Sequence, residues 1–524
     1  MPDAMRMAFG YLNEFFNMRD LVIGIDSSTT STKAIAFDQN GKVVGQGRAS
    51  IALSNPHPGW FEQNVEDWLA SLNTALQQLF KIISSERIAA IAISNQRETF
   101  AQFDVKNKPL RPGSLWLDER SHAEVALLSQ ELGAKKIHQI TGKPPDVTPC
   151  LYRCRWFSAH EPKMWKKMAR TAEVHGVIVH YLTDKWNTSI ASADPMGLID
   201  MKRSDWSDLI LEAAMLRRSQ LPNLFRPGEV VGEVTARAAK LTGLRAGTLV
   251  VAGGGDGQCA GTGANIFQPG RAYLNLGTAI VSGSYGLKYA TDPAWRTEMA
   301  VSEEGYVFET AIRTGTYLIN WMVERLFNVD VKKQKKILQI LEQEAAKSPI
   351  GAKGLMLVPY WSGCMTPYWD TSARGLIAGL SSYHTRGDIY RAVLEAMALE
   401  QTMMTNSVDE TTNKIDHYAV VGGGSNSDLW CQIISDVSGR SVKRLDTVEA
   451  SALGAAMAAA KGAQWYSKIA EASAAMSGKP IRTFRPRKKQ NSRYNELLRI
   501  YTDLWPHVSS WNKRLIEFSR DSIK

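Results

Sequence analysis

The chain has 524 residues, of which 44% are hydrophobic, and a formal net charge of +10. A chain of this length exceeds the size at which one hydrophobic core keeps growing, so we expect two large domains. The basic residues are spread out, which is typical of a solvated surface and does not favour a nucleic-acid partner, and no segment approaches the roughly 18 uncharged apolar residues of a membrane span.

The first 20 residues form an N-terminal extension to which we assign no role. They lack the basic end, the long apolar centre and the cleavage site of a signal peptide, so we expect a cytoplasmic protein. Five scattered cysteines follow no zinc-ligand spacing and are expected to be reduced, buried thiols: Cys150, Cys154, Cys259, Cys364 and Cys431.

The pattern of apolar residues predicts two α/β blocks along the chain. The first has strands at 21–26, 33–38, 42–48 and 88–94, with a helix at 65–84 before the last strand. The second repeats the opening hairpin in AYLNLGTAIVSGSYG and continues with helices near 316–327 and 388–405, a strand at 417–421, and helices at 427–438 and 449–461. We therefore expect domains at residues 21–265 and 266–524.

The first hairpin carries the loop IDSSTTSTK, which places Asp26, six Ser or Thr residues and Lys33 between two apolar runs. Hydroxyl groups are also common in ordinary turns, so the loop alone leaves a structural role open. Backbone N–H groups and hydroxyls can line an anion pocket to which Lys33 adds positive charge, while Asp26 can hold a hydrated cation beside the anion. The loop therefore predicts a site for nucleotide phosphates.

Three further turns have the composition of ligand sites. Leu276-Gly277-Thr278-Ala279 lies between two strands, and the triple glycines in VVGGGSNSD (420–428) and VVAGGGDGQ (250–258) each follow a buried strand and precede a helix. Glycine lets the backbone approach a ligand closely, and a helix N-terminus favours an anionic or polar group. Asp256 could be a simple helix cap, or it could accept the proton of a hydroxyl that attacks phosphorus.

The segment Ser94-Asn95-Gln96-Arg97-Glu98-Thr99 comes directly after a buried strand, where open α/β sheets bind ligands. Arg97 and Glu98 could donate to and accept from neighbouring hydroxyls, and Trp116 could cover the carbon chain of a polyol. An ordinary surface pair between Arg97 and Glu98 is the alternative.

The most specific motif is GLIAGL (375–380), followed after seven residues by DIYRAVLE (388–395). It matches at every position the downstream signature of the FGGY family of carbohydrate kinases, which belongs to the superfamily of sugar kinases, actin and heat-shock chaperones. The chain resembles this family from about Leu21 to Trp505, with all five motifs in family order. The resemblance implies two ribonuclease H-like domains around a central cleft, and phosphorylation of a sugar by ATP with Mg²⁺.

The resemblance also implies a role for each motif residue. Asp256 would be the catalytic base, and Asp26 would lie by the magnesium. The phosphates would be approached by Thr29, Thr30, Lys33, Gly277 and Thr278, and the adenosine would be bordered by Gly423, Gly424 and Ser425. The sugar would be held by Gln96, Arg97, Glu98, Trp116, Asp256 and Gln258.

Four positions depart from the family pattern. Ser28 stands where a glycine is usual, Arg153 replaces a lysine, Thr148 stands where glycerol kinases have a tyrosine, and Gln258 is one residue further from Asp256 than the glycerol kinase glutamine. The segment 193–200 is closer to ketose kinases. We therefore expect transfer to a primary hydroxyl of a small ketose or polyol, such as xylulose, ribulose or a tetrose.

Two alternatives stay open. The segment Asn95-Gln96-Arg97-Glu98-Thr99 resembles the glycerol kinase version, so a glycerol kinase is the nearest alternative. An actin-like or chaperone-like ATPase would share the phosphate turns without phosphorylating a sugar, but it would need neither the Arg97-Glu98 pair nor Trp116. The sequence does not set the oligomeric state, and a homodimer is one alternative.

Overall fold

The computed structural model describes residues 19–329, 334–447 and 449–521, so most of the extension expected at residues 1–20 lies outside the described residues. The contacts divide the chain into two compact units. The first comprises residues up to Phe267 with Thr297–Val307 and Glu449–Gly478, and the second comprises Gln268–Arg296, Phe308–Val448 and the rest from Lys479. This division differs from a single boundary after residue 265, because two later segments pack with the first unit.

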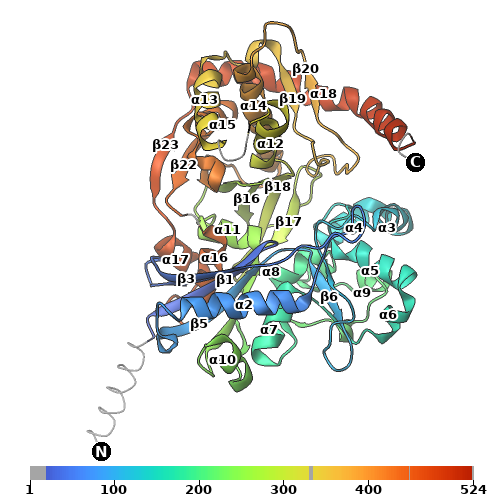
Figure 1. Ribbon diagram of the computed structural model, residues 1–524, viewed down its shortest axis with the longest axis vertical. Coiled ribbons are helices and arrows are strands. Elements are labelled where there is room, and N and C mark those ends of the chain that lie inside the picture. The colour runs from blue at the N-terminus through green and yellow to red at the C-terminus, as the bar shows by residue number, and fades with distance from the viewer. Residues whose placement is uncertain (1–18, 330–333, 448, 522–524) are drawn as a thin grey trace, which may run out of the picture. The chain divides into compact units, whose positions relative to one another are not determined.

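The first unit is built on a six-stranded sheet (Figure 1). Its strands are, in spatial order, β13 (Val230–Glu233), β14 (Leu249–Gly255), β5 (Ile88–Asn95), β1 (Leu21–Ser27), β2 (Ser31–Phe37) and β3 (Val43–Ser50). Strands β1, β2 and β3 form an antiparallel meander, and β5 and β14 continue the sheet in parallel with β1. The predicted strands are confirmed to within two residues at each end.

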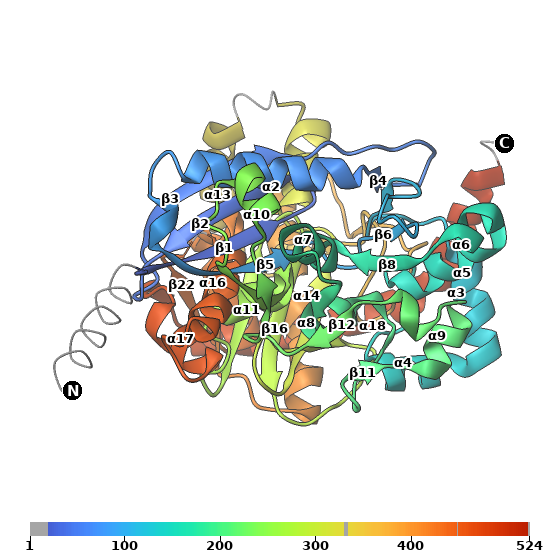
Figure 2. The same cartoon turned by 90° about the horizontal axis from the view of Figure 1, so that it is seen from below.

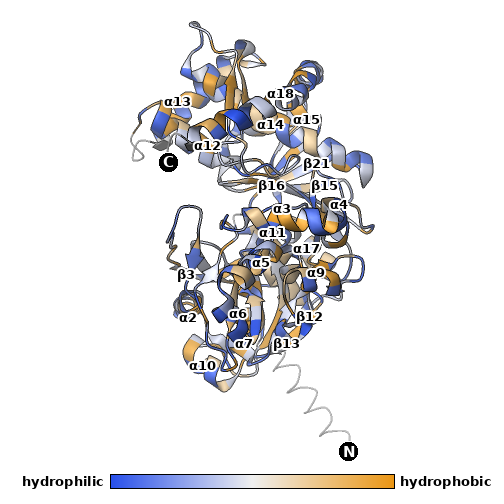
Figure 3. Ribbon diagram, turned by 90° about the vertical axis from the view of Figure 1, so that its right-hand side faces the viewer, coloured by the Kyte–Doolittle hydropathy of each residue, from blue (hydrophilic) through white to orange (hydrophobic). Residues whose placement is uncertain are grey.

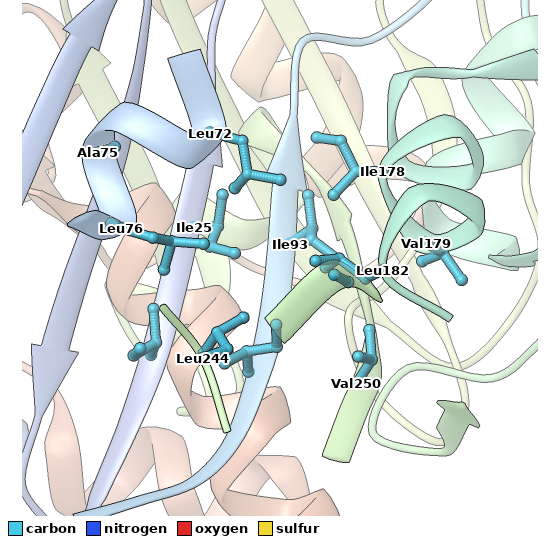
Figure 4. Packing of buried hydrophobic residues seen from close by; sticks show 14 of the residues in the cluster. Ile25, Leu72, Ala75, Leu76, Ile93, Ile178, Val179, Leu182, Leu244 and Val250 are labelled. Carbon is cyan, nitrogen blue, oxygen red and sulfur yellow. The ribbon is translucent and has the colours of Figure 1, made fainter. Parts of the chain in front are cut away.

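One face of this sheet is covered by helices α2 (Val65–Leu79), α7 (Val174–Thr183) and α10 (Ala236–Thr242). Figure 4 shows the resulting core, in which Ile25 and Ile93 of the sheet lie with Leu72 and Leu76 of α2 and Ile178 of α7. These side chains are fully buried, and each contributes roughly 1.5–3 kcal/mol to the free energy of unfolding.

The opposite face of the sheet is covered by a late segment of the chain, helix α16 (Ala450–Gly462) (Figure 2). Side chains alternate along a strand, so Gly24 faces away from the Ile23 and Ile25 side chains. A Cβ on Gly24 would lie 1.8 Å from the backbone oxygen of Ala452. The alanine-rich sequence of α16 therefore packs its backbone directly against β1.

Helix α16 also contacts α11 (Asp256–Gly263), the helix that follows β14. A Cβ on Gly454 would lie 1.9 Å from the backbone oxygen of Cys259, so the two helix backbones touch. The remaining elements of the first unit include a four-stranded sheet and several helices: β4 (Glu62–Gln63), β6 (Phe100–Phe103), β7 (Gly113–Ser114), β8 (Arg170–Glu173), α3 (His122–Leu128), α4 (Ala134–Thr141), α5 (Cys150–His160), α6 (Pro162–Lys167), α8 (Ile190–Ala193), α9 (Asp208–Ala213) and α17 (Ile469–Met476).

The second unit repeats the arrangement of the first. Its strands are, in spatial order, β18 (Tyr306–Ile312), β16 (Ile280–Gly286), β15 (Arg271–Leu276), β21 (His417–Val421), β22 (Ser441–Leu445) and β23 (Pro480–Phe484). Strand β17 (Arg296–Met299) has all its residues except Arg296 in the segment Thr297–Val307 of the first unit. Strand β15 is antiparallel to β16 and parallel to β21, which is parallel to β22. The order β18-β16-β15-β21-β22 thus corresponds to β3-β2-β1-β5-β14, and the predicted reuse of the first pattern is confirmed.

The helices of the second unit include α12 (Thr316–Trp321), α13 (Gln334–Lys347), α14 (Arg386–Thr411), α15 (Asp428–Ser438) and α18 (Lys488–Asp521). Helix α18 carries both polar and apolar residues along its length (Figure 3). The helix predicted at 316–327 is confirmed, although its second half is a π-helical turn (Met322–Leu326). The helix predicted at 65–84 ends instead at Leu79, because Ser84 caps a separate short turn that leads into β5.

All five cysteines are free and buried, as the sequence predicts. Among the described helices none combines the length and apolar character needed to cross a membrane.

Candidate functional site

In the first unit, three of the predicted motifs meet at one edge of the sheet. Strands β1, β5 and β14 are parallel neighbours, and the register places Asp26 beside Ser94 and Gly255 beside Asn95. The loop after β1, the segment after β5 and the start of α11 therefore follow strand ends that lie side by side. This is the edge at which open α/β sheets bind ligands.

Asp26 is 8% exposed and accepts a hydrogen bond from Ser94 Oγ at 3.2 Å. The pKa of its carboxyl is raised to about 7, chiefly by burial and next by the negative charge of Asp256, while Lys33 acts in the opposite direction. Because two carboxylates repel each other at this edge, a cation between them would be stabilised.

Lys33, opposite Asp26 in the β1–β2 hairpin, forms an ion pair with Glu449 at 2.5 Å. Glu449 also raises the pKa of Asp26. The carboxylates of Asp26, Asp256 and Glu449 face two cations, Lys33 and Arg97, so one negative charge is in excess, which favours an additional cation. Among the described residues, no three His, Cys, Asp or Glu side chains are arranged as metal ligands.

Asp256 is the first residue of α11 and follows the triple glycine of β14. Its Oδ1 accepts hydrogen bonds from Arg97 Nε at 3.0 Å and from the Gly257 backbone N–H at 2.8 Å. The side chain is 40% exposed. The carboxylate is thus held at a helix N-terminus while part of it stays accessible, which is the geometry that a base acting on a bound hydroxyl needs.

Arg97 and Glu98 follow β5 and are both nearly buried, at 8% and 3% exposure. Arg97 lies between two carboxylates, with Nη1 3.7 Å from Glu298 Oε1 in addition to its bond to Asp256. Glu98 has a φ of +50°, a conformation that costs energy for a residue with a side chain. The pair is therefore not the solvated surface pair that was the alternative.

The loop predicted to bind phosphates and the residues predicted to bind the sugar are joined by hydrogen bonds. Trp116 Nε1 donates to Thr29 Oγ1 at 3.0 Å, and Gln63 Nε2 donates to the Thr29 backbone oxygen at 2.6 Å. Gln96, only 1% exposed, donates to Gln63 Oε1 at 3.0 Å. Trp116 thus holds the loop at Thr29 directly, and Gln96 holds it through Gln63. Thr30, at the tip of the loop, is exposed.

Gln258 lies in the interior of the first unit, behind Asp256. It has no exposed surface, and its Nε2 donates to the Ala191 backbone oxygen at 2.8 Å and to Asp194 Oδ1 at 3.1 Å. The structure therefore does not bring Gln258 to the same accessible edge as Asp256.

The departures from the family pattern have local explanations. Ser28 donates from Oγ to the Ser31 backbone oxygen at 2.8 Å and closes the loop without a positive φ, so a glycine is not required. Arg153 is fully buried and hydrogen bonds Ser114 Oγ and the backbone oxygens of Leu115, Glu98 and Thr148. A planar guanidinium can connect three segments in this way, whereas a lysine ammonium has fewer donors.

Thr148 faces the interior. Its backbone N–H and its hydroxyl both donate to Asp146 Oδ1, and the residue is 3% exposed.

In the second unit, the two predicted nucleotide turns lie next to each other. Strands β15 and β21 are parallel neighbours, with Asn275 opposite Val421. A Cβ on Gly422 would lie 2.3 Å from Asn275 Oδ1, and one on Gly424 would lie 2.9 Å from the Leu276 backbone oxygen. The end of β15, directly before Gly277 and Thr278, therefore touches the 3₁₀ turn Gly423–Asn426.

Both turns are held by local hydrogen bonds. The Gly277 backbone oxygen accepts from Thr316 N at 2.8 Å, at the start of α12, and Ser425 Oγ donates to the Gly422 backbone oxygen at 2.6 Å. Gly423 has open space where a Cβ would be, with no atom of the described residues within 4 Å. A flat ligand could approach the backbone there.

The sequence motifs do not include three charged residues that the structure places behind Asp256 and Arg97: Lys143, Asp194 and Glu298. Neither Lys143 nor Glu298 belongs to a motif, and Lys143 reaches the strand that carries Glu298 across 154 positions of sequence. Asp194 lies in the segment 193–200, which resembles ketose kinases, and this resemblance was the only feature of the sequence that pointed to the cluster.

The sequence matches the FGGY family of carbohydrate kinases in two parts, the N-terminal domain over residues 21–263 and the C-terminal domain over residues 272–463. A xylulose kinase from Bacillus subtilis is 28% identical over 505 residues, covering 95% of this chain and 99% of that protein. A glycerol kinase from Thermococcus gammatolerans is 29% identical over 472 residues, covering 87% and 91%.

Among solved structures, a xylulose kinase from Rhodospirillum rubrum superposes with a TM-score of 0.85 at 26% identity, covering 94% of this chain and 99% of that one. The two sheets with a repeated strand order agree with the two-domain fold of actin and the sugar kinases. The chain is a carbohydrate kinase and belongs to the FGGY family.

Proposed function

We propose that the protein transfers the γ-phosphoryl group of ATP to a primary hydroxyl of a small ketose or polyol, with Asp256 as general base. The observation that carries the proposal is the Asp256 carboxylate, which is partly exposed and is oriented by Arg97 Nε at 3.0 Å and by the Gly257 N–H at 2.8 Å. A carboxylate fixed in this way can take the proton of an attacking hydroxyl.

The sugar is proposed to bind to the first unit, against Arg97, Glu98 and Trp116. Arg97 is fixed by carboxylates on two sides, and the Trp116 ring is oriented by its bond to Thr29 Oγ1 at 3.0 Å. These residues offer a donor, an acceptor and a flat apolar surface to a short carbon chain. Gln96 and Gln258 stay predictions as sugar-binding residues, since both are buried and hydrogen bonded to protein atoms.

The nucleotide is proposed to bind through the loop that contains Asp26, Thr29, Thr30 and Lys33, and through the second-unit turns that contain Gly277, Thr278, Gly423, Gly424 and Ser425. When Mg²⁺ is bound, it neutralises charge on the transferred phosphoryl group. Asp26 suits it as a partner because the neighbouring carboxylates leave an excess of negative charge. Lys33 would have to exchange its pair with Glu449 for a phosphate oxygen.

The sugar is proposed to be a ketose of the xylulose type, as the names of two of the relatives suggest. A glycerol kinase is the second candidate, favoured by the segment 95–99 and by the archaeal relative. Thr148 argues against it, because its hydroxyl is turned toward Asp146 and does not replace a tyrosine at a substrate.

The test is a turnover screen in which the protein is incubated with ATP, Mg²⁺ and one of xylulose, ribulose, erythrulose, erythritol or glycerol, while ADP formation is followed. We expect the highest kcat/KM for a ketose, because a site built for several hydroxyls loses binding energy when its polar groups are left unpaired. Glycerol emerging as the best acceptor would replace the ketose proposal. An absence of turnover with every acceptor would contradict the choice of a small ketose or polyol.

A further inference from the structure

Five ionisable side chains from distant parts of the sequence form one charged cluster in the first unit: Arg97, Lys143, Asp194, Asp256 and Glu298. Four of them are 8% exposed or less, and only Asp256 reaches solvent appreciably, with 40% of its side chain exposed. Charges buried to this degree are costly unless each is paired. The five side chains therefore have to form one connected network of ion pairs, and Asp256 is its solvent-accessible end.

The contacts run in a line from Asp256 inward. Arg97 Nε lies 3.0 Å from Asp256 Oδ1, and Arg97 Nη1 lies 3.7 Å from Glu298 Oε1. Glu298 Oε2 lies 3.0 Å from Lys143 Nζ, which is also 2.9 Å from Asp194 Oδ2. The guanidinium of Arg97 is thus shared by one accessible carboxylate and one fully buried carboxylate.

Glu298 itself is held firmly by its backbone neighbours. Lys143 Nζ donates to the Thr297 backbone oxygen at 2.7 Å, and the Met299 backbone N–H donates to Asp194 Oδ2 at 2.6 Å. The residues on both sides of Glu298 are therefore bonded to the same Lys143–Asp194 pair that lies beside its side chain. This leaves the Glu298 carboxylate little freedom to move.

The charges of the network balance when one proton is retained. It contains two cations and three carboxyl groups, and burial together with the neighbouring Glu298 raises the pKa of Asp194 well above its usual range, although Lys143 opposes this. With one proton held between Asp194 and Glu298, the cluster is neutral. Such a cluster is stable when buried and gives Arg97 a fixed electrostatic environment.

We propose that Glu298 is a positioning residue for phosphoryl transfer: it holds the Arg97 guanidinium so that Arg97 fixes the Asp256 carboxylate toward the sugar hydroxyl. The inference rests on the proposed role of Asp256 as base. Arg97 is a long side chain, and a second charged contact at Nη1 restricts its orientation more than the Nε bond does by itself. Displacing a reacting group by about 1 Å can cost a hundredfold in rate, so the anchor at Glu298 should be visible in kcat.

The first experiment compares Glu298→Gln with Glu309→Gln in the full-length protein. Glu309 is a matched control because it is also fully buried and paired with an arginine, with Arg296 Nε 2.7 Å from its Oε1, and because Arg296 and a second hydrogen-bond partner, Tyr273, are not members of the Asp256 network. We expect Glu298→Gln to lower kcat by about tenfold to a hundredfold with the KM for ATP nearly unchanged. Glu309→Gln should keep kcat while lowering the melting temperature.

The second experiment is a double-mutant cycle with Arg97→Lys, which keeps the charge but removes the forked geometry. If Glu298 acts through Arg97, Glu298→Gln should have little further effect on kcat/KM once Arg97 is replaced. The inference would be overturned if the double variant lost kcat/KM by the product of the two single losses. It would also be overturned if the Glu298 and Glu309 variants lost kcat equally.

The wild-type protein separates this inference from the proposed function. If the wild type shows no turnover with any acceptor, both fall together. If the wild type turns over and Glu298→Gln retains full kcat, the kinase proposal stands and the positioning role of Glu298 is overturned.

Discussion

At the scale of single residues, the Asp256 carboxylate is oriented by two donors. Its Oδ1 accepts hydrogen bonds from Arg97 Nε and from the Gly257 N–H, and its negative charge raises the pKa of the Asp26 carboxyl. The proposed base has to point at the hydroxyl whose proton it takes, and these two donors fix that direction.

Replacing Asp256 with Asn should therefore abolish phosphoryl transfer while leaving nucleotide binding in place. The amide keeps the size of the side chain but cannot accept a proton, and a general base contributes roughly a hundred- to ten-thousand-fold to the rate. ADP formation measures the loss, and calorimetric titration with ATP and Mg²⁺ measures binding. A folded Asp256→Asn protein with near-normal turnover would place the base elsewhere.

Glu400 is a buried carboxyl of the second unit, on helix α14. It accepts hydrogen bonds from Tyr360 Oη at 2.8 Å and from Tyr501 Oη at 2.5 Å. Burial raises the pKa of Glu400 to about 7, although the two tyrosine hydroxyls oppose the shift. The folded protein thus holds a proton at pH values where the unfolded chain, with a pKa of about 4.5 for this group, has released it.

Because the folded pKa is raised, the stability that Glu400 contributes is fully present below about pH 4.5 and is lost as the pH rises through 7. Glu400→Gln carries no such proton, so its free energy of unfolding relative to the wild type should rise by about 2–3 kcal/mol between pH 5 and pH 8. Urea unfolding at both pH values measures this difference. Parallel pH profiles for the two proteins would show that Glu400 is ionised in the folded state.

At the scale of secondary-structure elements, the family signature has a structural role in helix α14. Thr385 and Asp388 form a capping box at its start, and Asp388 Oδ1 also accepts from Ser348 Oγ at 2.6 Å. Arg391 and Glu395 pair at 2.6 Å, and both hydrogen bond the Tyr494 hydroxyl. Residues of the family signature therefore have a structural role: they hold the buried helix α14 in place.

The packing of α16 on β1 and α11 depends on the absence of side chains at two glycines. Gly24→Ala would place a Cβ 1.8 Å from the Ala452 backbone oxygen, which cannot move without the helix, so we expect a loss of at least about 1–3 kcal/mol in stability. The matched control is Gly423→Ala, where a Cβ meets no described atom within 4 Å and should change stability by less than about 1 kcal/mol. Equal melting temperatures for the two variants would contradict this account.

Local patterns in the sequence were sufficient to predict the elements and the turns at the strand ends. The strands around Asp26 and Gly277 show apolar runs on both sides of a polar turn, and parallel neighbours necessarily end at the same edge. The partners of those residues could not be predicted in the same way. Lys33 pairs with Glu449 across 416 positions of sequence. The Lys143–Glu298 contact depends on tertiary packing, which the local periodicity of apolar residues does not predict.

At the scale of the whole molecule, neither unit is a continuous stretch of chain. The first unit is completed by Thr297–Val307 and by Glu449–Gly478, and the second of these segments includes α16 and α17. Ser451 Oγ donates to the Asp256 backbone oxygen at 3.1 Å, so this late segment also supports the start of helix α11, which carries the proposed base. A cut at the boundary read from the sequence would therefore remove part of the first unit.

A fragment of residues 19–267 should consequently fail to fold alone, because the Gly24 face of its sheet and one side of α11 would be left uncovered. Co-expression with a peptide of residues 449–478 should raise its soluble yield, and the same peptide carrying Gly454→Val, which cannot seat against Cys259, should not. Soluble yield and the cooperativity of urea unfolding measure the effect. Cooperative unfolding of the 19–267 fragment without the peptide would contradict this expectation.

The contact between β1 and α16 also constrains how the protein is made. Gly24 leaves the ribosome about 440 residues before the end of its covering helix at Gly462. At roughly 5–20 residues per second, translation needs about 20–90 s to deliver that helix. Throughout this interval an apolar sheet face stays open on the nascent chain, so slower elongation prolongs its exposure to aggregation and its dependence on chaperones.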